Sequence, residues 1–198
     1  MQILKIFLAG LMITLPTLAI AQGKPVGIRP DVAAVSVETG SGPVEISRVQ
    51  DNKNLISQDW AKTSRPCPPF CIQPMIVAEG VATVGELELM DMLQDPDVIV
   101  ADARTSKWFN AGTIPGAVHM PFGQVVDRLE EFGCEPDFDG WDCETAKPVA
   151  LFCNGNWCGQ SPTAIRAMLA EGYPAEKIYY YRGGMHAWQM LGLTVKVP

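Results

Sequence analysis

The sequence predicts an α/β domain with a parallel sheet and helices on both faces. Two observations carry this prediction. Short runs rich in apolar and aromatic residues, at 98–101, 149–152 and 177–181, are typical of buried strands. Helical patterns alternate with these runs, and this alternation favours parallel strands joined by crossover helices. The domain is expected to span 81–198 and to follow an irregular N-terminal extension.

The first 21 residues are predicted to be a secretory signal peptide. Lys5 precedes an apolar run from Ile6 to Ile20, and Ala19-Ile20-Ala21 has the small-x-small pattern of a cleavage site. The run is shorter than the ~20 residues that a membrane-spanning anchor needs. We therefore expect cleavage near Ala21, a periplasmic or secreted protein, and no membrane association afterwards.

Residues 22–80 form the expected extension. The stretch 32–49 alternates loosely around a Gly- and Ser-rich break at 39–43, which predicts a β-hairpin with a long turn. Four prolines among residues 66–74 exclude a helix or a central strand there. This segment, called the strap below, should lie on the domain surface and carries Cys67 and Cys71.

Apolar spacing predicts two helices in the first half of the domain, one before the strand at 98 and one after a strand at 118. Their marker residues are Leu89, Met90 and Leu93 for the first and Val125, Leu129 and Phe132 for the second. Functional residues of parallel sheets gather at the carboxyl ends of strands. Cys153 stands at such an end.

The segment 149–165 predicts a strand, a polar loop opened by Cys153, and a helix. Ser161 and Pro162 suit the N-cap and the first helical position. Such a loop directs backbone N–H groups inward at the positive end of the helix dipole. We expect this arrangement to lower the pKa of the Cys153 thiol and to create an anion site. Cys153 is therefore a candidate nucleophile.

Several ordered motifs resemble those of rhodanese-like (sulfurtransferase) domains. They are Asp102-Ala103-Arg104, the run 112–121, the Cys153 loop, Gly172-Tyr173, and Arg182-Gly183-Gly184-Met185-His186-Ala187-Trp188. The resemblance implies a five-stranded parallel sheet. It also implies transfer of a sulfane sulfur from a thiosulfate-like donor to a thiol acceptor through a persulfide on Cys153.

The resemblance also assigns the residues around the nucleophile. The loop N–H groups would cradle the persulfide or an anion, and their residues are Asn154, Gly155, Asn156, Trp157, Cys158, Gly159, Gln160 and Ser161. Asp102 and Arg104 would have a structural role near the site and brace the surrounding loops. Positive charge could come from outside the loop, from Arg104, Arg166 or Arg182, and the sequence does not place these side chains. Many family members carry a basic residue in the loop, whereas this chain has none between Cys153 and Ser161.

Cys158 supports a second interpretation. A second thiol in the loop could resolve a persulfide or sulfenic acid on Cys153. The protein would then be a thiol-disulfide redox or sulfur-carrier module that cycles Cys153 and Cys158, or the two would form an inert brace. A phosphatase- or arsenate-reductase-like use of the loop would need an Arg at its end, and none is present.

The other four cysteines form two close pairs, which we expect to be disulfides outside the cytoplasm: Cys67 with Cys71, and Cys134 with Cys143. A redox role for the strap pair stays open, whereas its spacing lacks the Cys-x-x-Cys arm of a zinc site. Acidic residues within 135–144 do not have EF-hand spacing, so a solvated loop closed by a disulfide is favoured over a calcium site. We expect no metal and no cofactor.

Charge restricts the partners. With 22 acidic and 15 basic residues the chain carries a net charge of −7, and clustered Lys and Arg for phosphate contacts are absent, which argues against nucleic-acid binding. We expect a small sulfur-containing anion or thiol acceptor, which a partner protein could supply. Trp157 is a candidate wall for that substrate or partner. The sequence leaves open the donor, the acceptor, the role of the extension and the oligomeric state.

Overall fold

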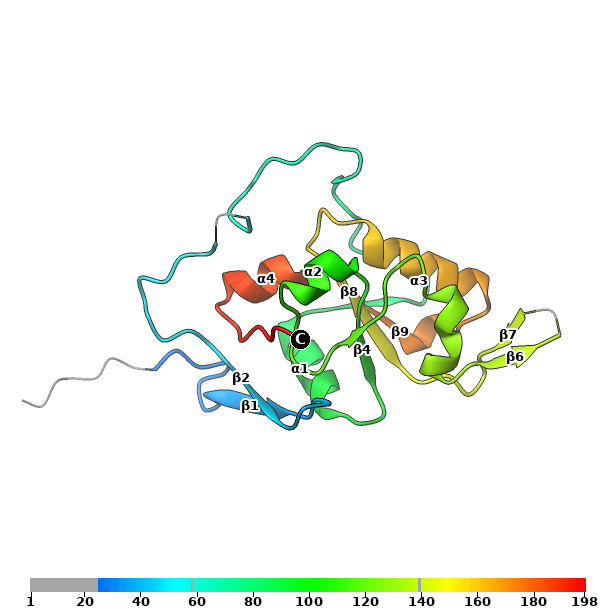
Figure 1. Ribbon diagram of the computed structural model, residues 1–198, viewed down its shortest axis with the longest axis horizontal. Helices are drawn as coiled ribbons and strands as arrows, with labels where there is room; N and C mark the ends of the chain where they lie inside the picture. Colours follow the sequence, from blue (N-terminus) through cyan, green and yellow to red (C-terminus); the bar gives the residue numbers. More distant parts are fainter. Residues whose placement is uncertain (1–24, 58, 139) are drawn as a thin grey trace, which may run out of the picture.

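The computed structural model describes residues 25–57, 59–138 and 140–198, so the expected signal peptide lies outside the described residues. Its centre is a five-stranded sheet with the order β3-β9-β8-β4-β5, in which every neighbouring pair is parallel (Figure 1). The strands are β3 (Ala82–Val84), β9 (Ile178–Tyr181), β8 (Val149–Phe152), β4 (Ile99–Asp102) and β5 (Val118–His119). The predicted parallel five-stranded sheet is confirmed.

Helices cover both faces of this sheet, as predicted. One face carries α3 (Gln160–Ala170) and the 3-10 helix η1 (Val126–Phe132). The opposite face carries α1 (Glu86–Gln94) and α4 (Gly184–Met190). The short helix α2 (Ser106–Asn110) follows β4, and the 3-10 turn η2 (Ala175–Lys177) precedes β9.

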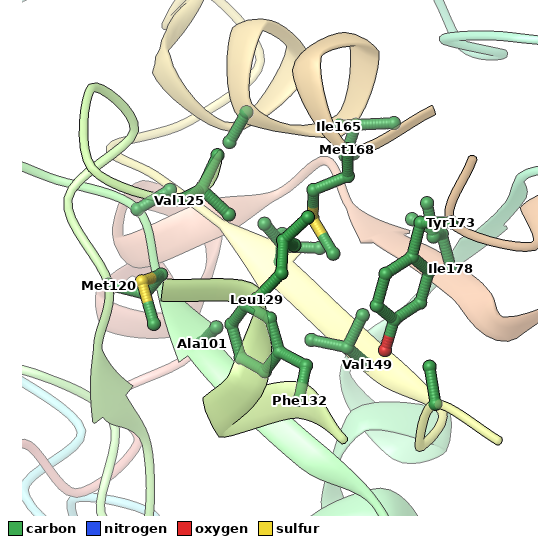
Figure 2. Packing of buried hydrophobic residues seen from close by; sticks show 14 of the residues in the cluster. Ala101, Met120, Val125, Leu129, Phe132, Val149, Ile165, Met168, Tyr173 and Ile178 are labelled. Atoms are coloured by element: carbon green, nitrogen blue, oxygen red, sulfur yellow. The ribbon is translucent and has the colours of Figure 1, made fainter. Parts of the chain in front are cut away.

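The core on the α3 face fixes the central strand β8. Ile165 and Met168 of α3 pack with Leu129 and Phe132 of η1 above Val149 of β8 (Figure 2). All five side chains are fully buried. Close packing on this scale leaves little freedom to the strand below, so the residue that follows β8 has a well-defined position.

The core on the other face recruits part of the N-terminal extension. Strands β1 (Ala34–Val37) and β2 (Val44–Ser47) form an antiparallel pair across the turn at 39–43. Val37 and Ile46 of this hairpin are buried with Leu89 of α1 and Trp188 of α4. The first part of the extension therefore completes the domain core.

The second predicted helix differs from the expectation in type. The first is present as α1, but the segment after β5 forms η1, with non-helical backbone angles at Arg128 (φ −130°, ψ 24°). Gly133 ends it in the left-handed region at φ 86°, where a residue without Cβ is unstrained. Leu129 and Phe132 face the core as predicted, because three-residue spacing serves a 3-10 turn as well as an α-helix.

The acidic insertion forms a small hairpin of β6 (Glu135–Asp137) and β7 (Gly140–Asp142). It lies at one end of the molecule (Figure 1). The sulfurs of Cys134 and Cys143 lie at disulfide distance at its base, and both residues are buried. Within the described ranges, no group of three or more His, Cys, Asp or Glu side chains is placed to hold a metal ion. No helix among these residues is long and apolar enough to cross a membrane.

Candidate functional site

The candidate nucleophile lies at the carboxyl edge of the sheet. The strand register sets Asp102, Phe152 and Tyr181 side by side, so Cys153 leaves the sheet between the ends of β4 and β9. Backbone N–H groups at the start of α4 hold the loop by donating to the carbonyl oxygens of Cys153 (3.0 Å) and Asn154 (2.9 Å).

Gly184 makes this close approach of α4 to the loop possible. A Cβ at position 184 would lie 2.3 Å from the carbonyl oxygen of Cys153 and 2.7 Å from the amide nitrogen of Gly155. Neither distance is tolerable, and Gly184 also has a positive φ of 55°. Any larger residue would push α4 away from the cysteine loop.

Ser161 directs its hydroxyl at the candidate nucleophile. Ser161 Oγ donates to Cys153 Sγ at 3.1 Å, and the Ser161 backbone N–H also points at this sulfur. The predicted helix start was wrong by two residues, because α3 begins at Gln160 with Gly159 as N-cap. The Gly159 carbonyl already accepts from Thr163 N at 3.0 Å. Ser161 therefore lies inside the first turn, where its hydroxyl is free to serve the cysteine.

The expectation of a lowered pKa for Cys153 was also wrong. Burial raises the pKa of the Cys153 thiol well above its ordinary value, and its hydrogen bond with Cys158 raises it further. The side chain is 1% exposed, so a thiolate there loses most of its solvation. The bonds from Ser161 oppose this rise only in part. The thiol donates to the carbonyl oxygen of Cys158 at 3.1 Å.

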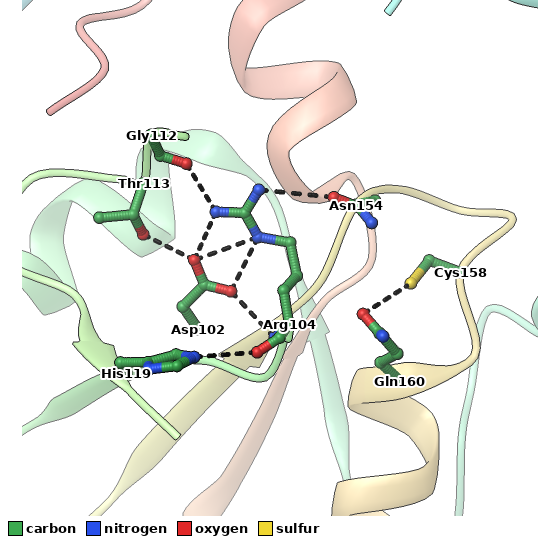
Figure 3. A network of polar contacts seen from close by, with 8 residues as sticks. All are labelled: Asp102, Arg104, Gly112, Thr113, His119, Asn154, Cys158 and Gln160. Atoms are coloured by element: carbon green, nitrogen blue, oxygen red, sulfur yellow. Dashed lines mark hydrogen bonds and ion pairs between the residues drawn. The ribbon is translucent and has the colours of Figure 1, made fainter. Parts of the chain in front are cut away.

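Cys158 is the thiol with the lowered pKa. The hydrogen bond from Cys153 lowers the pKa of Cys158 to about 7. Burial opposes this shift, and the backbone N–H groups of Gln160 and Asn154 add to it. Its own thiol contacts Gln160 Oε1 at 3.6 Å (Figure 3). Two N–H groups of the expected cradle thus already serve the Cys158 sulfur.

A buried ion pair connects β4 to the loop, as Figure 3 shows. Arg104 donates to both Asp102 carboxylate oxygens, with the shortest contact at 2.6 Å, and to the carbonyl of Gly112 at 2.7 Å. Its third nitrogen reaches Asn154 Oδ1 at 3.4 Å. Thr113 Oγ1 donates to the same carboxylate at 2.7 Å. Asp102 and Arg104 therefore lie behind the loop in a bracing position, at 0% and 1% side-chain exposure.

Arg182 holds the strap and does not reach into the loop. Its Nε and Nη2 donate to the carbonyl oxygen of Gln73 at 3.2 and 2.9 Å. The backbone N–H of Gln73 in turn donates to the carbonyl oxygen of Asn156 at 2.8 Å. The strap is thereby tied by one residue both to the end of β9 and to the cysteine loop.

Trp157 lies between two side chains from the extension. The Arg65 guanidinium carbon is 3.8 Å from the Trp157 ring centroid, and the Phe70 ring meets it edge-on at 5.6 Å between centroids. A cleft of about 710 Å³ opens beside it, between extension and loop. Its lining includes Asn156 and His186, with Lys62, Arg65, Cys67, Phe70 and Cys71 on the other wall.

The sequence motifs did not reveal Arg65, Phe70 or Gln73 as neighbours of the loop. The indication that the sequence offered was the loop aromatic Trp157, a candidate wall for a substrate or partner. The strap sulfurs, Cys67 and Cys71, lie at disulfide distance from each other beside the loop. His119 bonds the carbonyl oxygen of Arg104 at 3.0 Å, a structural position.

The fold and the cysteine loop together define a rhodanese-like module. A model of the rhodanese-like domain family matches residues 86–191, which is more than half of the chain. The chain therefore belongs to the rhodanese-like domain family.

Three relatives illustrate the range of this family. The chain is 28% identical to an HTH-type transcriptional regulator of Mycobacterium tuberculosis, over 57% of this chain and 43% of the regulator. It is 33% identical to a tRNA uridine(34) hydroxylase of Synechocystis sp., over 64% of this chain and 46% of that enzyme. It is 26% identical to a sulfurtransferase of Allochromatium vinosum, over 52% of this chain and 81% of that protein. The chain spans less than half the length of the first two.

Proposed function

We propose that the protein is a sulfurtransferase that moves a sulfane sulfur from a thiosulfate-like donor to a thiol acceptor through a persulfide on Cys153. One observation carries the proposal. Cys153 Sγ lies at the carboxyl end of β8 and accepts hydrogen bonds from the hydroxyl and the backbone N–H of Ser161, at the start of α3. The sulfurtransferase of Allochromatium vinosum, similar over most of its own length, supports the same class of activity.

The first half-reaction loads the enzyme. The Cys153 thiol loses its proton, and the thiolate attacks the outer sulfur of thiosulfate. A new S–S bond forms on Cys153, the bond to the central sulfur breaks, and sulfite leaves with that electron pair. The Ser161 hydroxyl stabilises the thiolate and then the persulfide. Because burial opposes ionisation of Cys153, loading should become faster as pH rises.

The second half-reaction unloads it. The thiolate of an acceptor attacks the outer sulfur, which leaves Cys153 as a thiolate and the acceptor as a persulfide. In both steps, backbone N–H groups of the cysteine loop would stabilise the charge on the outer sulfur.

The test is the intact mass of the mature protein, reduced and then incubated with thiosulfate. We expect a gain of one sulfur atom, lost in Cys153→Ser and kept in Cys158→Ser. A gain that persists in Cys153→Ser would contradict the assignment of the nucleophile. Peptide mapping of the loaded protein should place the added sulfur on Cys153.

A redox module that cycles Cys153 and Cys158 is the second candidate. The placement of both thiols favours it, since Cys153 and Cys158 are unpaired and buried in one loop, and the Cys153 thiol contacts the carbonyl oxygen of Cys158 at 3.1 Å. In this case thiosulfate adds no sulfur, and mild oxidation removes two hydrogens and links the loop cysteines. The same mass experiment therefore separates the two candidates.

We also propose export and oxidation of the remaining four cysteines. The sequence at 5–21 has the features of a cleaved signal, and both cysteine pairs lie at disulfide distance. The protein recovered from the periplasm or medium should begin near Gln22. Alkylation without reduction should modify at most the two loop cysteines.

A further inference from the structure

We propose that the strap pair Cys67–Cys71 is a second redox site of this protein, one that exchanges disulfide bonds with Cys158 of the cysteine loop. The inference rests on oxidation of the strap pair and does not require the sulfurtransferase activity. It gives the loop thiols an electron partner within the same chain.

The cleft between strap and loop places the strap cysteines opposite the loop residues that immediately precede Cys158. Cys67 and Cys71 line one wall, and Asn156 and Trp157, the two residues before Cys158, line the other. Gln73, two residues after Cys71, bonds the carbonyl oxygen of Asn156 at 2.8 Å. A Cβ at Gly159, the residue after Cys158, would contact the Gln73 side chain at 3.6 Å. Cys71 on the strap and Cys158 on the loop thus lie on either side of the contact that Gln73 makes with the loop.

Four contacts hold the strap and Arg65, the residue before it, beside the loop. Arg65 and Phe70 enclose the Trp157 ring, Gln73 bonds Asn156, and Arg182 bonds Gln73. Phe70 and Gln73 flank Cys71 closely in the chain. A reactive pair held this way has a high effective concentration at its partner.

The strap sulfurs are open to attack, whereas the loop thiols are shielded. Cys67 is exposed and Cys71 is half-buried, while Cys153 and Cys158 are both buried. Of the two loop thiols, Cys158 has its pKa lowered to about 7 by the hydrogen bond from Cys153, so it supplies thiolate near neutral pH. Exchange requires its side chain to turn from the cradle toward the cleft.

The exchange balances without an external oxidant. The Cys158 thiolate attacks Cys71 Sγ, a Cys71–Cys158 bond forms, and Cys67 leaves as a thiolate. Cys153 passes its proton to that thiolate and attacks Cys158 Sγ, which forms a Cys153–Cys158 bond and releases Cys71 as a thiolate. The loop loses two electrons and the strap gains them. The reverse sequence returns the loop to its dithiol form.

The second pair, Cys134 and Cys143, provides the internal contrast. Both of its residues are buried, at the base of the β6–β7 hairpin. It lies away from the strap and the cysteine loop (Figure 1). The same chain therefore carries a shielded pair and an accessible pair, and only the accessible one faces the loop.

The test uses the full mature chain with Cys67→Ser and Cys153→Ser, which leaves Cys71 and Cys158 as the two thiols outside the hairpin pair. One equivalent of dithiobis(nitrobenzoate) labels one of them and releases one coloured thiolate. We expect the other thiol to displace a second coloured thiolate, at a rate unchanged over a roughly tenfold range of protein concentration. Peptide mapping should then find a Cys71–Cys158 bridge.

Adding Cys158→Ser to this chain is the matched control, and it should stop at one coloured thiolate with the label on Cys71. Cys134 and Cys143 should stay linked in both chains, and the thermal transition by circular dichroism should show that both are folded. If the chain with Cys67→Ser and Cys153→Ser is folded but also releases only one coloured thiolate, the proposal is overturned. A second release that depends on protein concentration overturns it as well.

Sulfur uptake from thiosulfate is measured in parallel on Cys67→Ser alone, where Cys153 is intact. If Cys67→Ser takes up sulfur but the chain with Cys67→Ser and Cys153→Ser forms no Cys71–Cys158 bridge, the exchange is overturned and the sulfurtransferase assignment stands. If the Cys71–Cys158 bridge forms but the wild-type chain takes up no sulfur from thiosulfate, the sulfurtransferase assignment is overturned and the exchange stands. The two proposals therefore fail separately.

Discussion

Ser161 and Cys153 form the contact on which the proposed chemistry depends most. Their Oγ–Sγ distance is 3.1 Å, and the serine is fully buried. A hydrogen bond to a charged group contributes about 1.5–3 kcal/mol. The hydroxyl therefore offsets part of the cost of forming a thiolate in a site that excludes water.

Ser161→Ala should raise the pKa of Cys153 further and slow sulfur uptake by at least roughly tenfold at neutral pH. The rate of Cys153 alkylation by iodoacetamide, measured against pH in a Cys158→Ser background, is the readout. Reaction needs the thiolate, so the profile rises with pH, and the variant's rise should lie at higher pH. An unshifted profile would show that Ser161 does not act on the sulfur.

Cys158→Ser should leave persulfide formation intact and shift the Cys153 alkylation profile to lower pH. The reason is that the hydrogen bond and the charge of Cys158 both raise the pKa of Cys153. The variant should also be oxidised beyond the sulfenic state by peroxide, because no loop thiol can resolve it. Intact mass before and after peroxide checks this. Complete loss of sulfur uptake would favour the resolving role instead.

At the scale of elements, the end of β4 and the cysteine loop are coupled through one ion pair. Arg104 joins Asp102 to Asn154 and to Gly112, and it is almost fully buried. Removing one partner of a buried pair leaves an uncompensated charge, which costs about 3–5 kcal/mol.

Arg104→Ala should therefore lower the free energy of unfolding by about 3–5 kcal/mol, measured by urea denaturation. The matched control is Arg128→Ala, which breaks the partly exposed pair with Glu131 at 2.6 Å. Exposed pairs contribute about 0–1 kcal/mol. Equal losses in the two variants would contradict a bracing role for Arg104.

At the scale of the whole molecule, the extension and the domain share one core. Ile46 of β2 is fully buried with Phe152 of β8 and Trp188 of α4. The hairpin also bonds the C-terminal segment, where Ser47 N donates to Thr194 Oγ1 at 3.0 Å. Residues 34–47 thus belong to the folded unit.

Ile46→Ala should destabilise the entire domain by about 2–5 kcal/mol, because it leaves a cavity in that core. Ile72→Ala, on the strap at 84% exposure, should change stability by no more than about 0.5 kcal/mol. Urea unfolding followed by tryptophan fluorescence compares them. A separate early transition in the Ile46 variant would show instead that the hairpin unfolds independently.

Features that follow from neighbouring residues were predicted correctly, whereas features that depend on tertiary contacts were not. The alternation of apolar strands with helices led to the correct sheet and to helices on both faces, because periodicity is a property of neighbouring residues. The start of α3 was misplaced, since Ser161 has the residue type of an N-cap but its hydroxyl bonds Cys153. The pKa of Cys153 was misjudged because the helix-dipole argument did not include complete burial.

The sequence by itself determined the rhodanese-like fold and the place of Cys153 at the end of a strand, because both follow from local pattern and ordered motifs. Only the tertiary structure decided which thiol is acidic and what lies beside the loop. Desolvation of Cys153 depends on everything packed around it. The contacts of Arg65, Phe70 and Gln73 with the loop join segments more than 80 residues apart. Such proximity is a consequence of chain folding, and no neighbouring residue encodes it.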